Sequence, residues 1–199
     1  MTNLSDPVAN NMLQMRPIYV VNNFGQFNHL IIRSLRDHDI DAKLIPNTTP
    51  PDDITEGCRG IILGGGPDLS RIGNCISYLD AGVPVLGICL GLHIITISRG
   101  GTVRPGVKGG YGAIDVIVQN DESILSGYPQ QMQVWASHAD EVQEIPPGFI
   151  RLATSSISPF EAIASTDNQI FGIQWHPEVS HSFEGFRVFE NFDLITQES

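Results

Sequence analysis

The chain has 199 residues, of which 22 are acidic and 11 are basic, so its formal net charge is −11. With 41% apolar residues and a length typical of one domain, it can bury a sizeable core, which argues against intrinsic disorder. The acidic balance and the singly scattered Lys and Arg residues argue against binding to a nucleic-acid backbone.

Three features favour a cytoplasmic protein without membrane association. No apolar run approaches the roughly 20 residues that span a bilayer. Residues 1–15 lack both the basic and the apolar regions of a signal peptide. Cys58, Cys75 and Cys89 are odd in number and form no C-x-x-C pair, which argues against a disulfide framework and against a thiolate zinc site.

The first half of the chain predicts alternating strands and helices. Residues 1–16 are polar and without periodicity, so we expect a loose arm before a single domain over 17–199. Short apolar runs that end in Gly, Asn or Pro predict strands, and apolar residues three or four apart predict helices. These rules place strands at 18–21, 42–45, 60–63 and 83–88, a loop at 46–51, and helices at 27–35, 69–79 and 90–98.

The second half predicts mostly strands separated by Gly, Pro, Asn and Asp turns. The expected elements are strands at 113–119, 131–136, 149–155, 161–166 and 170–175, followed by a helix at 183–195. Earlier strands that are apolar on both faces indicate a parallel sheet covered by helices on both sides. The sequence therefore predicts an α/β domain with a mostly parallel central sheet, to which the later strands add antiparallel sheet.

A candidate nucleophile lies in Gly87-Ile88-Cys89-Leu90-Gly91, where an apolar strand is predicted to meet a helix. A nucleophile on such a sharp turn is held in strained backbone geometry, and a Cβ at either glycine position would collide with the turn. The N-terminus of the following helix would favour a thiolate. The alternative interpretation of Cys89 is a buried core cysteine between closely packed glycines.

A candidate base for this nucleophile lies in His176-Pro177-Glu178. Pro177 excludes a helix, so in an extended segment Glu178 would hold one ring nitrogen of His176 while the other faces Cys89. The simpler alternative is an exposed histidine beside a surface glutamate. A metal site would recruit His181, but it lacks a third well-spaced ligand, so no metal is expected.

A glycine-rich turn, Gly64-Gly65-Gly66-Pro67, follows the strand predicted at 60–63. Such a turn can present backbone N–H groups to an oxyanion, together with the N–H of Leu90 directly after the candidate nucleophile. Binding of a phosphate group is the competing interpretation. It is disfavoured because the turn lacks the Walker lysine and does not have the G-x-G-x-x-G pattern.

Taken together in this order, the glycine turn, G-I-C-L-G and Q-W-H-P-E resemble the class I, or triad, glutamine amidotransferases over nearly all of 17–195. The resemblance implies a flavodoxin-like three-layer sandwich. It also implies a catalytic triad, two N–H groups that form an oxyanion hole, and an edge of the pocket that holds glutamine and is formed in part by known residues. The residues are Cys89, His176 and Glu178 for the triad, Gly66 and Leu90 for the oxyanion hole, and Ser137 and His138 for the glutamine-holding edge.

One position departs from the family pattern. Family members usually have Gln two residues after the glycine that corresponds to Gly91, and the amide of that Gln contacts the substrate. This chain has His93 at that position. An imidazole can also form a hydrogen bond with glutamine, so His93 is a candidate substrate-binding residue. The alternative is a helix histidine that serves only local packing.

Within the family, residues 20–30 and 134–142 look like the free-standing glutaminase subunits of two-subunit GMP synthases. That resemblance implies hydrolysis of glutamine through a cysteine thioester. The ammonia would pass to a separate ATP-pyrophosphatase (synthetase) subunit that aminates XMP to GMP. ATP and Mg would then belong to the partner subunit, and no cofactor is expected in this chain.

Three alternative functions stay open. A sister subunit for anthranilate or imidazole-glycerol-phosphate synthesis would share the triad, although the S-H-A-D-E-V segment favours the GMP synthase branch. A stand-alone γ-glutamyl hydrolase would use the same cysteine without a partner. A non-catalytic domain that has kept the fold is the alternative from a different class.

Overall fold

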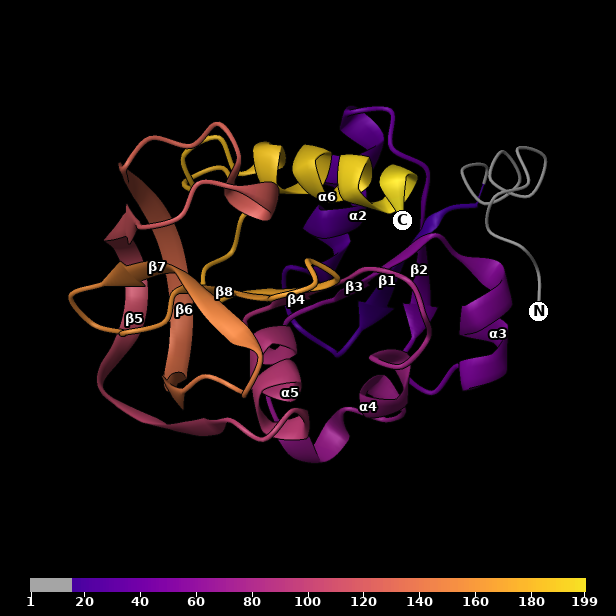
Figure 1. Cartoon of the computed structure of the whole chain (residues 1–199), viewed down its shortest axis with the longest axis horizontal. Coiled ribbons are helices and arrows are strands. Elements are labelled where there is room, and N and C mark those ends of the chain that lie inside the picture. The colour runs from indigo at the N-terminus through magenta and orange to yellow at the C-terminus, as the bar shows by residue number, and fades with distance from the viewer. Residues whose placement is uncertain (1–15) are drawn as a thin grey trace.

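The computed structural model describes residues 16–199, so the predicted arm at 1–16 lies almost entirely outside the described residues (Figure 1). Five parallel strands form one half of a single sheet: β1 (Ile18–Asn22), β2 (Ala42–Pro46), β3 (Gly60–Leu63), β4 (Val85–Ile88) and β9 (Ile170–Ile173). Both β3 and β4 are buried at every position. Their unbroken apolar character is explained by this burial, because helices cover both faces of the sheet.

The other half of the sheet is antiparallel. It is built from β5 (Thr102–Val118), β6 (Gln131–Glu144), β7 (Phe149–Ser155) and β8 (Ala162–Ser165). Strand β8 pairs antiparallel with β9, so the two halves join there. The strand order of the nine-stranded sheet is β2-β1-β3-β4-β9-β8-β7-β5-β6. The predicted α/β fold with later antiparallel strands is confirmed.

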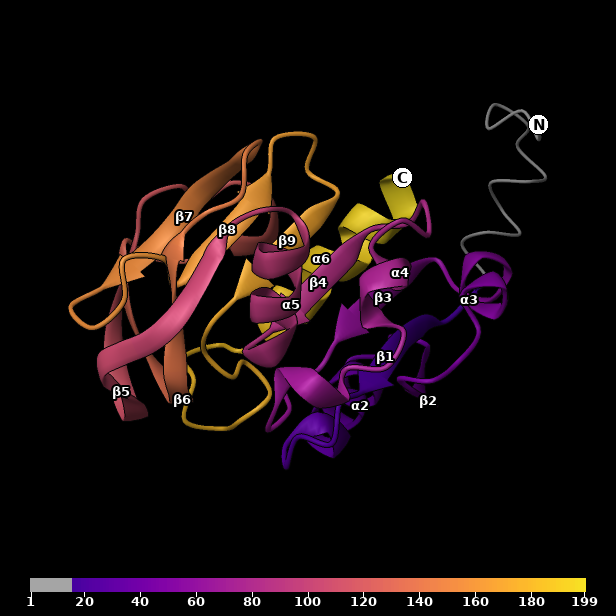
Figure 2. The same cartoon turned by 90° about the horizontal axis from the view of Figure 1, so that it is seen from below.

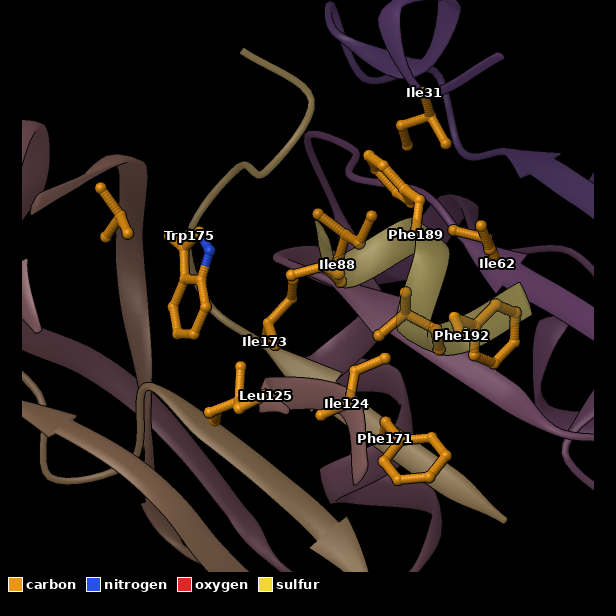
Figure 3. Close-up of a cluster of buried hydrophobic side chains, with 14 of the residues drawn as sticks. Ile31, Ile62, Ile88, Ile124, Leu125, Phe171, Ile173, Trp175, Phe189 and Phe192 are labelled. Atoms are coloured by element: carbon orange, nitrogen blue, oxygen red, sulfur yellow. The ribbon is translucent and has the colours of Figure 1, made fainter. Parts of the chain in front are cut away.

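Helices form the two outer layers. One face of the sheet carries α2 (Asn28–Asp37) and α6 (Phe186–Glu198), and the opposite face carries α3 (Pro51–Gly57), α4 (Cys75–Tyr78) and α5 (Leu90–Ser98) (Figures 1 and 2). Phe189 and Phe192 of α6 pack over Ile62 and Ile88 of the sheet (Figure 3). Each face of the parallel half therefore has its own apolar core.

The prediction of one continuous helix over 69–79 is wrong. The structure has a short 3₁₀ turn at Leu69–Arg71 and then α4, with Gly73 between them at φ +55°. A Cβ at Gly73 would lie 2.4 Å from the carbonyl oxygen of Asn47. The chain breaks here because a neighbouring loop packs against it, which apolar spacing alone does not reveal.

Other boundaries also differ from the prediction. Helix α3 was not predicted, although Pro51 and the acidic residues of its first turn are start signals. Strands β5 and β6 are much longer than 113–119 and 131–136, because they pair with each other over most of their length. The final helix begins at Phe186 rather than at residue 183.

Candidate active site

The candidate residues meet at one edge of the parallel half of the sheet. In the register of the strands, Leu63 of β3 pairs with Gly87 of β4, and Ile88 of β4 pairs with Ile173 of β9. Parallel strands bring their carboxyl ends to the same edge, where ligands of open α/β sheets bind. The glycine turn, Cys89 and the His176 segment follow directly after these three strands.

Cys89 lies on a strained turn between β4 and α5. Its φ is +54°, a conformation that side chains other than glycine rarely adopt. A Cβ at Gly87 would lie 2.4 Å from the carbonyl carbon of Gly91, and a Cβ at Gly91 would lie 2.2 Å from the carbonyl oxygen of Leu63. The predicted strain and the predicted need for both glycines are confirmed, although the atom that excludes a Cβ at Gly91 belongs to β3 and not to the turn itself.

His176 and Glu178 form a buried pair. Nδ1 of His176 lies 2.8 Å from Oε1 of Glu178, and both side chains are almost completely buried. The segment forms a turn at Pro177 and Glu178 rather than the extended chain that was expected. The ring of Phe27 packs edge-on against the imidazole, with 5.0 Å between the ring centroids. This pairing orients the ring and leaves Nε2 for another partner.

The pKa of His176 indicates what that partner is. Burial lowers the pKa, but hydrogen bonds to Cys89 and Glu178 and the negative charges of both groups outweigh burial and raise it to about 10. At neutral pH the imidazole is therefore held as a cation between the sulfur and the carboxylate. A neighbouring imidazolium stabilises negative charge on a cysteine sulfur, so the arrangement fits a thiolate nucleophile and a general acid.

Two cavities flank Cys89. The first, of about 320 Å³, is lined by Phe24, Gly25, Gln26, Phe27, Asn28, Gly65, Gly66, Pro67, Cys89, Ser137 and His176. The second, of about 250 Å³, is lined by Gly66, Pro67, Cys89, Leu90, His93, Tyr111, Ser137, His138, Ala139 and Asp140. Cys89 thus lines both cavities, and every predicted site residue except Glu178 lines at least one of them.

The backbone around Cys89 presents unused donors. Within residues 16–199, the N–H groups of Gly66 and Leu90 make no hydrogen bond. Leu90 opens α5, so its N–H is one of the four that have no acceptor inside the helix. Two unpaired N–H groups beside a nucleophile are the arrangement that stabilises an oxyanion.

Comparisons with known proteins decide the family. The profile of the family described as glutamine amidotransferase class-I matches residues 19–195. The chain belongs to this family. It is 68% identical over 181 residues to the glutamine-hydrolyzing GMP synthase subunit of Methanospirillum hungatei, and the match covers 91% of this chain and 96% of the relative. The corresponding subunit of Methanoculleus marisnigri is 60% identical over 184 residues, covering 92% of this chain and the whole relative.

Solved structures agree with this assignment. The crystal structure of a putative GMP synthase subunit from Thermoplasma acidophilum has a TM-score of 0.88 and 33% identity, covering 92% of this chain and 95% of that chain. A glutamine amidotransferase from Thermotoga maritima has a TM-score of 0.70 at 18% identity, covering 82% and 76%, which shows the shared fold alone.

His93 is the position at which this amidotransferase departs from the usual family pattern. Its Nε2 lies 2.9 Å from Oε1 of Gln174, and the residue is 4% exposed. Burial lowers the pKa of His93, so the ring is neutral at physiological pH. The imidazole is thus held from inside the protein while it lines the second cavity. Both earlier interpretations, local packing and substrate contact, fit this position.

The predicted glutamine edge lies on β6. The carbonyl oxygen of Ser137 is 3.9 Å from the sulfur of Cys89. Nδ1 of His138 lies 2.9 Å from the carbonyl oxygen of Asp140, and burial lowers the pKa of His138 to about 4. Its Nε2 is buried and has no hydrogen-bond partner among the residues that the structure describes. His138 is therefore neutral and has one ring nitrogen to spare near the cavity.

Sequence reasoning missed the residues that support the site. The hydroxyl of Ser182 donates to the carbonyl oxygen of His176 at 2.6 Å and accepts the N–H of Trp135 at 3.0 Å, which ties the triad segment to β6. Asn23 and Asn28, between β1 and the start of α2, donate to carbonyl oxygens of the glycine turn. The cluster of asparagines directly after a buried strand is the signal that could have revealed them.

Across residues 16–199 no three His, Cys, Asp or Glu side chains come together as a set of metal ligands. In the same range no helix has the length and apolar character needed to cross a membrane.

Proposed function

We propose that this chain is the glutaminase subunit of a GMP synthase. It hydrolyses L-glutamine to glutamate and ammonia through a thioester on Cys89, and the ammonia passes to a separate synthetase subunit. The observation that carries the chemistry is Cys89 on its strained turn beside an imidazolium that Glu178 holds. The GMP synthase assignment is supported by relatives of 60–68% identity that are named as its glutamine-hydrolyzing subunit.

The first half of the reaction forms the thioester. The thiolate of Cys89 attacks the side-chain carboxamide carbon of glutamine, and the carbonyl oxygen becomes an oxyanion. The N–H groups of Gly66 and Leu90 donate to that oxygen, each being worth roughly 3–4 kcal/mol by analogy with measured oxyanion holes. The protonated His176 then gives its proton to the departing nitrogen, so that ammonia leaves and a γ-glutamyl thioester remains.

The second half returns the enzyme to its starting state. His176, now neutral and still oriented by Glu178, removes a proton from water, and the resulting oxygen nucleophile attacks the thioester carbon. The carbon–sulfur bond breaks, glutamate leaves, and the imidazolium and thiolate are restored. We place the amino-acid part of glutamine in the second cavity, with Ser137, His138 and His93 as its binding residues.

The reaction balance needs only glutamine and water in this chain. We therefore assign ATP and Mg to the partner, an ATP-pyrophosphatase subunit that activates XMP before ammonia attacks it. The glutaminase subunits of anthranilate and imidazole-glycerol-phosphate synthases are the second candidates, because they would share the triad. The high identity to glutamine-hydrolyzing GMP synthase subunits favours the first assignment.

An amination assay tests the proposal. The chain and the synthetase subunit from the same source are purified together and supplied with XMP, ATP and Mg, and with either glutamine or ammonium. We expect GMP from both nitrogen sources with the pair, and from ammonium alone with the isolated synthetase. If the pair uses ammonium but not glutamine, this chain is not the nitrogen donor, and efficient hydrolysis of γ-glutamyl peptides without a partner would point to the stand-alone hydrolase.

A further inference from the structure

A set of buried asparagines lies beneath the glycine turn, outside the triad. Asn28, at the start of α2, is 3% exposed. Its Nδ2 donates to the carbonyl oxygen of Gly65 and to Oδ1 of Asn22, both at 3.1 Å. Because Nδ2 faces two acceptor oxygens, the reversed amide orientation would place three oxygens together, and this decides which way the amide points.

The amide oxygen of Asn28 lies close to the backbone at Gly64 and at Gly25. A Cβ at Gly64 would lie 2.5 Å from Oδ1 of Asn28, and a Cβ at Gly25 would lie 3.1 Å from the same atom. In the described part of the chain, this oxygen has no hydrogen-bond donor. Glycine at position 64 is therefore what allows the amide to approach the turn closely enough to hold Gly65.

A second asparagine, Asn23, holds the carbonyl group of Gly64, the residue before Gly65. Nδ2 of Asn23 donates to the oxygen of Gly64 at 3.1 Å, and Asn23 is 1% exposed. Its own Oδ1 accepts from Nδ2 of Asn47 and from the thiol of Cys75, both at 3.2 Å. Two successive carbonyl oxygens of the turn are thus held by buried amides, which are themselves fixed.

Peptide geometry links these carbonyl oxygens to the active site. All peptide bonds in residues 16–199 are trans, and in a trans peptide the C=O of one residue and the N–H of the next point in opposite directions. Holding the oxygen of Gly65 against Asn28 therefore turns the N–H of Gly66 away from Asn28. That N–H has no other acceptor in the described chain, and Gly66 lines both cavities beside Cys89.

We propose that Asn28 is a positioning residue for the oxyanion hole. It holds the Gly65–Gly66 peptide so that the Gly66 N–H is available to the oxyanion that forms at Cys89, and Asn23 braces the peptide before it. The proposal rests on the proposed glutaminase function. It assigns to Asn28 no contact with glutamine, only control of a backbone donor.

Two reactions of Cys89 separate this role from a merely structural one. Glutamine hydrolysis passes through tetrahedral oxyanions and needs the Gly66 donor. Alkylation by iodoacetamide does not, because the sulfur forms a bond to the methylene carbon while iodide leaves, and no oxyanion develops. A residue that acts only on the oxyanion hole should therefore affect the first reaction and spare the second.

The experiment uses Asn28→Ala and Asn28→Asp in complex with the synthetase subunit. Asn28→Asp keeps the shape of the side chain but replaces the donor to Gly65 by an acceptor. Loss of one oxyanion donor costs about 10²–10³-fold in kcat, so misorienting it is expected to lower kcat by about 10–100-fold in both variants. KM for glutamine and the alkylation rate of Cys89 are expected to change by less than about twofold.

The matched control is Asn74→Ala. Asn74 also donates to loop carbonyl oxygens, those of Thr48 and Thr49, but it lies outside both cavities. We expect wild-type kcat from it. Unchanged kcat in the Asn28 variants, or a parallel loss of kcat and alkylation, would overturn the positioning role. Absence of glutaminase activity in the wild-type complex would instead refute the proposed function.

A measurement on the unmodified protein covers the case in which the variants do not fold. Glutamate γ-semialdehyde adds the Cys89 sulfur to its aldehyde carbon and so forms a hemithioacetal whose oxygen occupies the oxyanion position. The Gly66 amide should then become protected from hydrogen exchange. A Gly66 amide that exchanges equally fast with and without the aldehyde would contradict the proposal.

Discussion

Cys89 and Cys75 are both buried cysteines, but their surroundings differ. Cys75 is fully buried in α4, donates to Asn23, and has a pKa that burial raises to about 12. Cys89 is 8% exposed, lines two cavities and faces the imidazolium of His176. Burial by itself therefore produces an inert protonated thiol, whereas a nucleophile needs a cavity and a cationic partner.

The largest expected effect concerns the two sulfurs themselves. Cys89→Ala should lower glutamine-dependent kcat by at least about 10⁴-fold, the order of loss when a covalent nucleophile is removed. Cys75→Ala should keep kcat within a few-fold, because that thiol only supports Asn23. Steady-state glutaminase assays of both variants in complex with the synthetase measure the contrast.

Labelling provides an independent check of the same contrast. An electrophilic glutamine analogue should modify Cys89 and leave Cys75 and Cys58 unmodified, as read by mass spectrometry of peptides. Preferential labelling of Cys75 or Cys58, or normal turnover by Cys89→Ala, would remove the distinction between Cys89 and the other cysteines.

The next effect concerns the cationic partner of Cys89. Glu178→Gln should lower kcat by about 10²–10⁴-fold, since loss of the orienting carboxylate in a related triad costs the upper value. The pKa of His176 should also be lower in this variant than in the wild type. In the wild type the pKa of His176 is raised to about 10 by Cys89 and Glu178 against the effect of burial, and removal of the carboxylate charge should move it down towards the ordinary value near 6.5.

The same variant has a predictable effect on stability. The folded-state pKa of His176 lies above its unfolded value, so the pair's contribution to the free energy of unfolding is complete below about pH 6.5. This contribution is lost as the pH rises through about 10. The stability difference between wild type and Glu178→Gln should therefore shrink between pH 6.5 and 10 in urea titrations. A difference that grows over this range would contradict the charge assignment.

A smaller effect concerns the backbone that makes the Cys89 turn. Gly91→Ala should destabilise the protein by an amount at the upper end of the ~1–3 kcal/mol typical of overpacking, because the new Cβ meets the carbonyl oxygen of Leu63. Gly82→Ala is the matched control. A Cβ at Gly82 would have no atom beyond its chain neighbours within 4 Å, so only the φ of +74° opposes a side chain there. This backbone strain costs roughly 1–2 kcal/mol of stability. Equal urea midpoints for the two variants would show that the close approach at Gly91 is unimportant.

The smallest expected effect concerns the helix that follows Cys89. His93→Gln should change kcat and KM only slightly, because a glutamine amide can still form a hydrogen bond with Gln174 from the same helix position. His93→Leu should be less stable by about 1–3 kcal/mol, since it leaves the buried oxygen of Gln174 without its partner. A large loss of kcat in His93→Gln would mean that the imidazole itself takes part in the reaction.

Local sequence patterns predicted much of the fold and the centre of the site. Gly87 is required before Cys89 because the backbone of Gly91, four positions further along the chain, leaves no room for a Cβ. The alternation of apolar runs predicted β1, β3 and β7 nearly to the residue. The H-P-E sequence placed a carboxylate beside an imidazole, although through a turn instead of an extended chain. Such features depend on neighbours within a few positions, so a single sequence carries them.

The surroundings of that centre depend on contacts between segments that are far apart in the sequence. Asn28 reaches Gly65 across 37 positions and His93 reaches Gln174 across 81, so both contacts depend on the order in which β1, β3, β4 and β9 lie side by side. The break at Gly73 likewise follows from the loop that packs against it. Hydrogen-bond partners and close packing between distant segments are set by strand order and register, and periodicity along one segment contains neither.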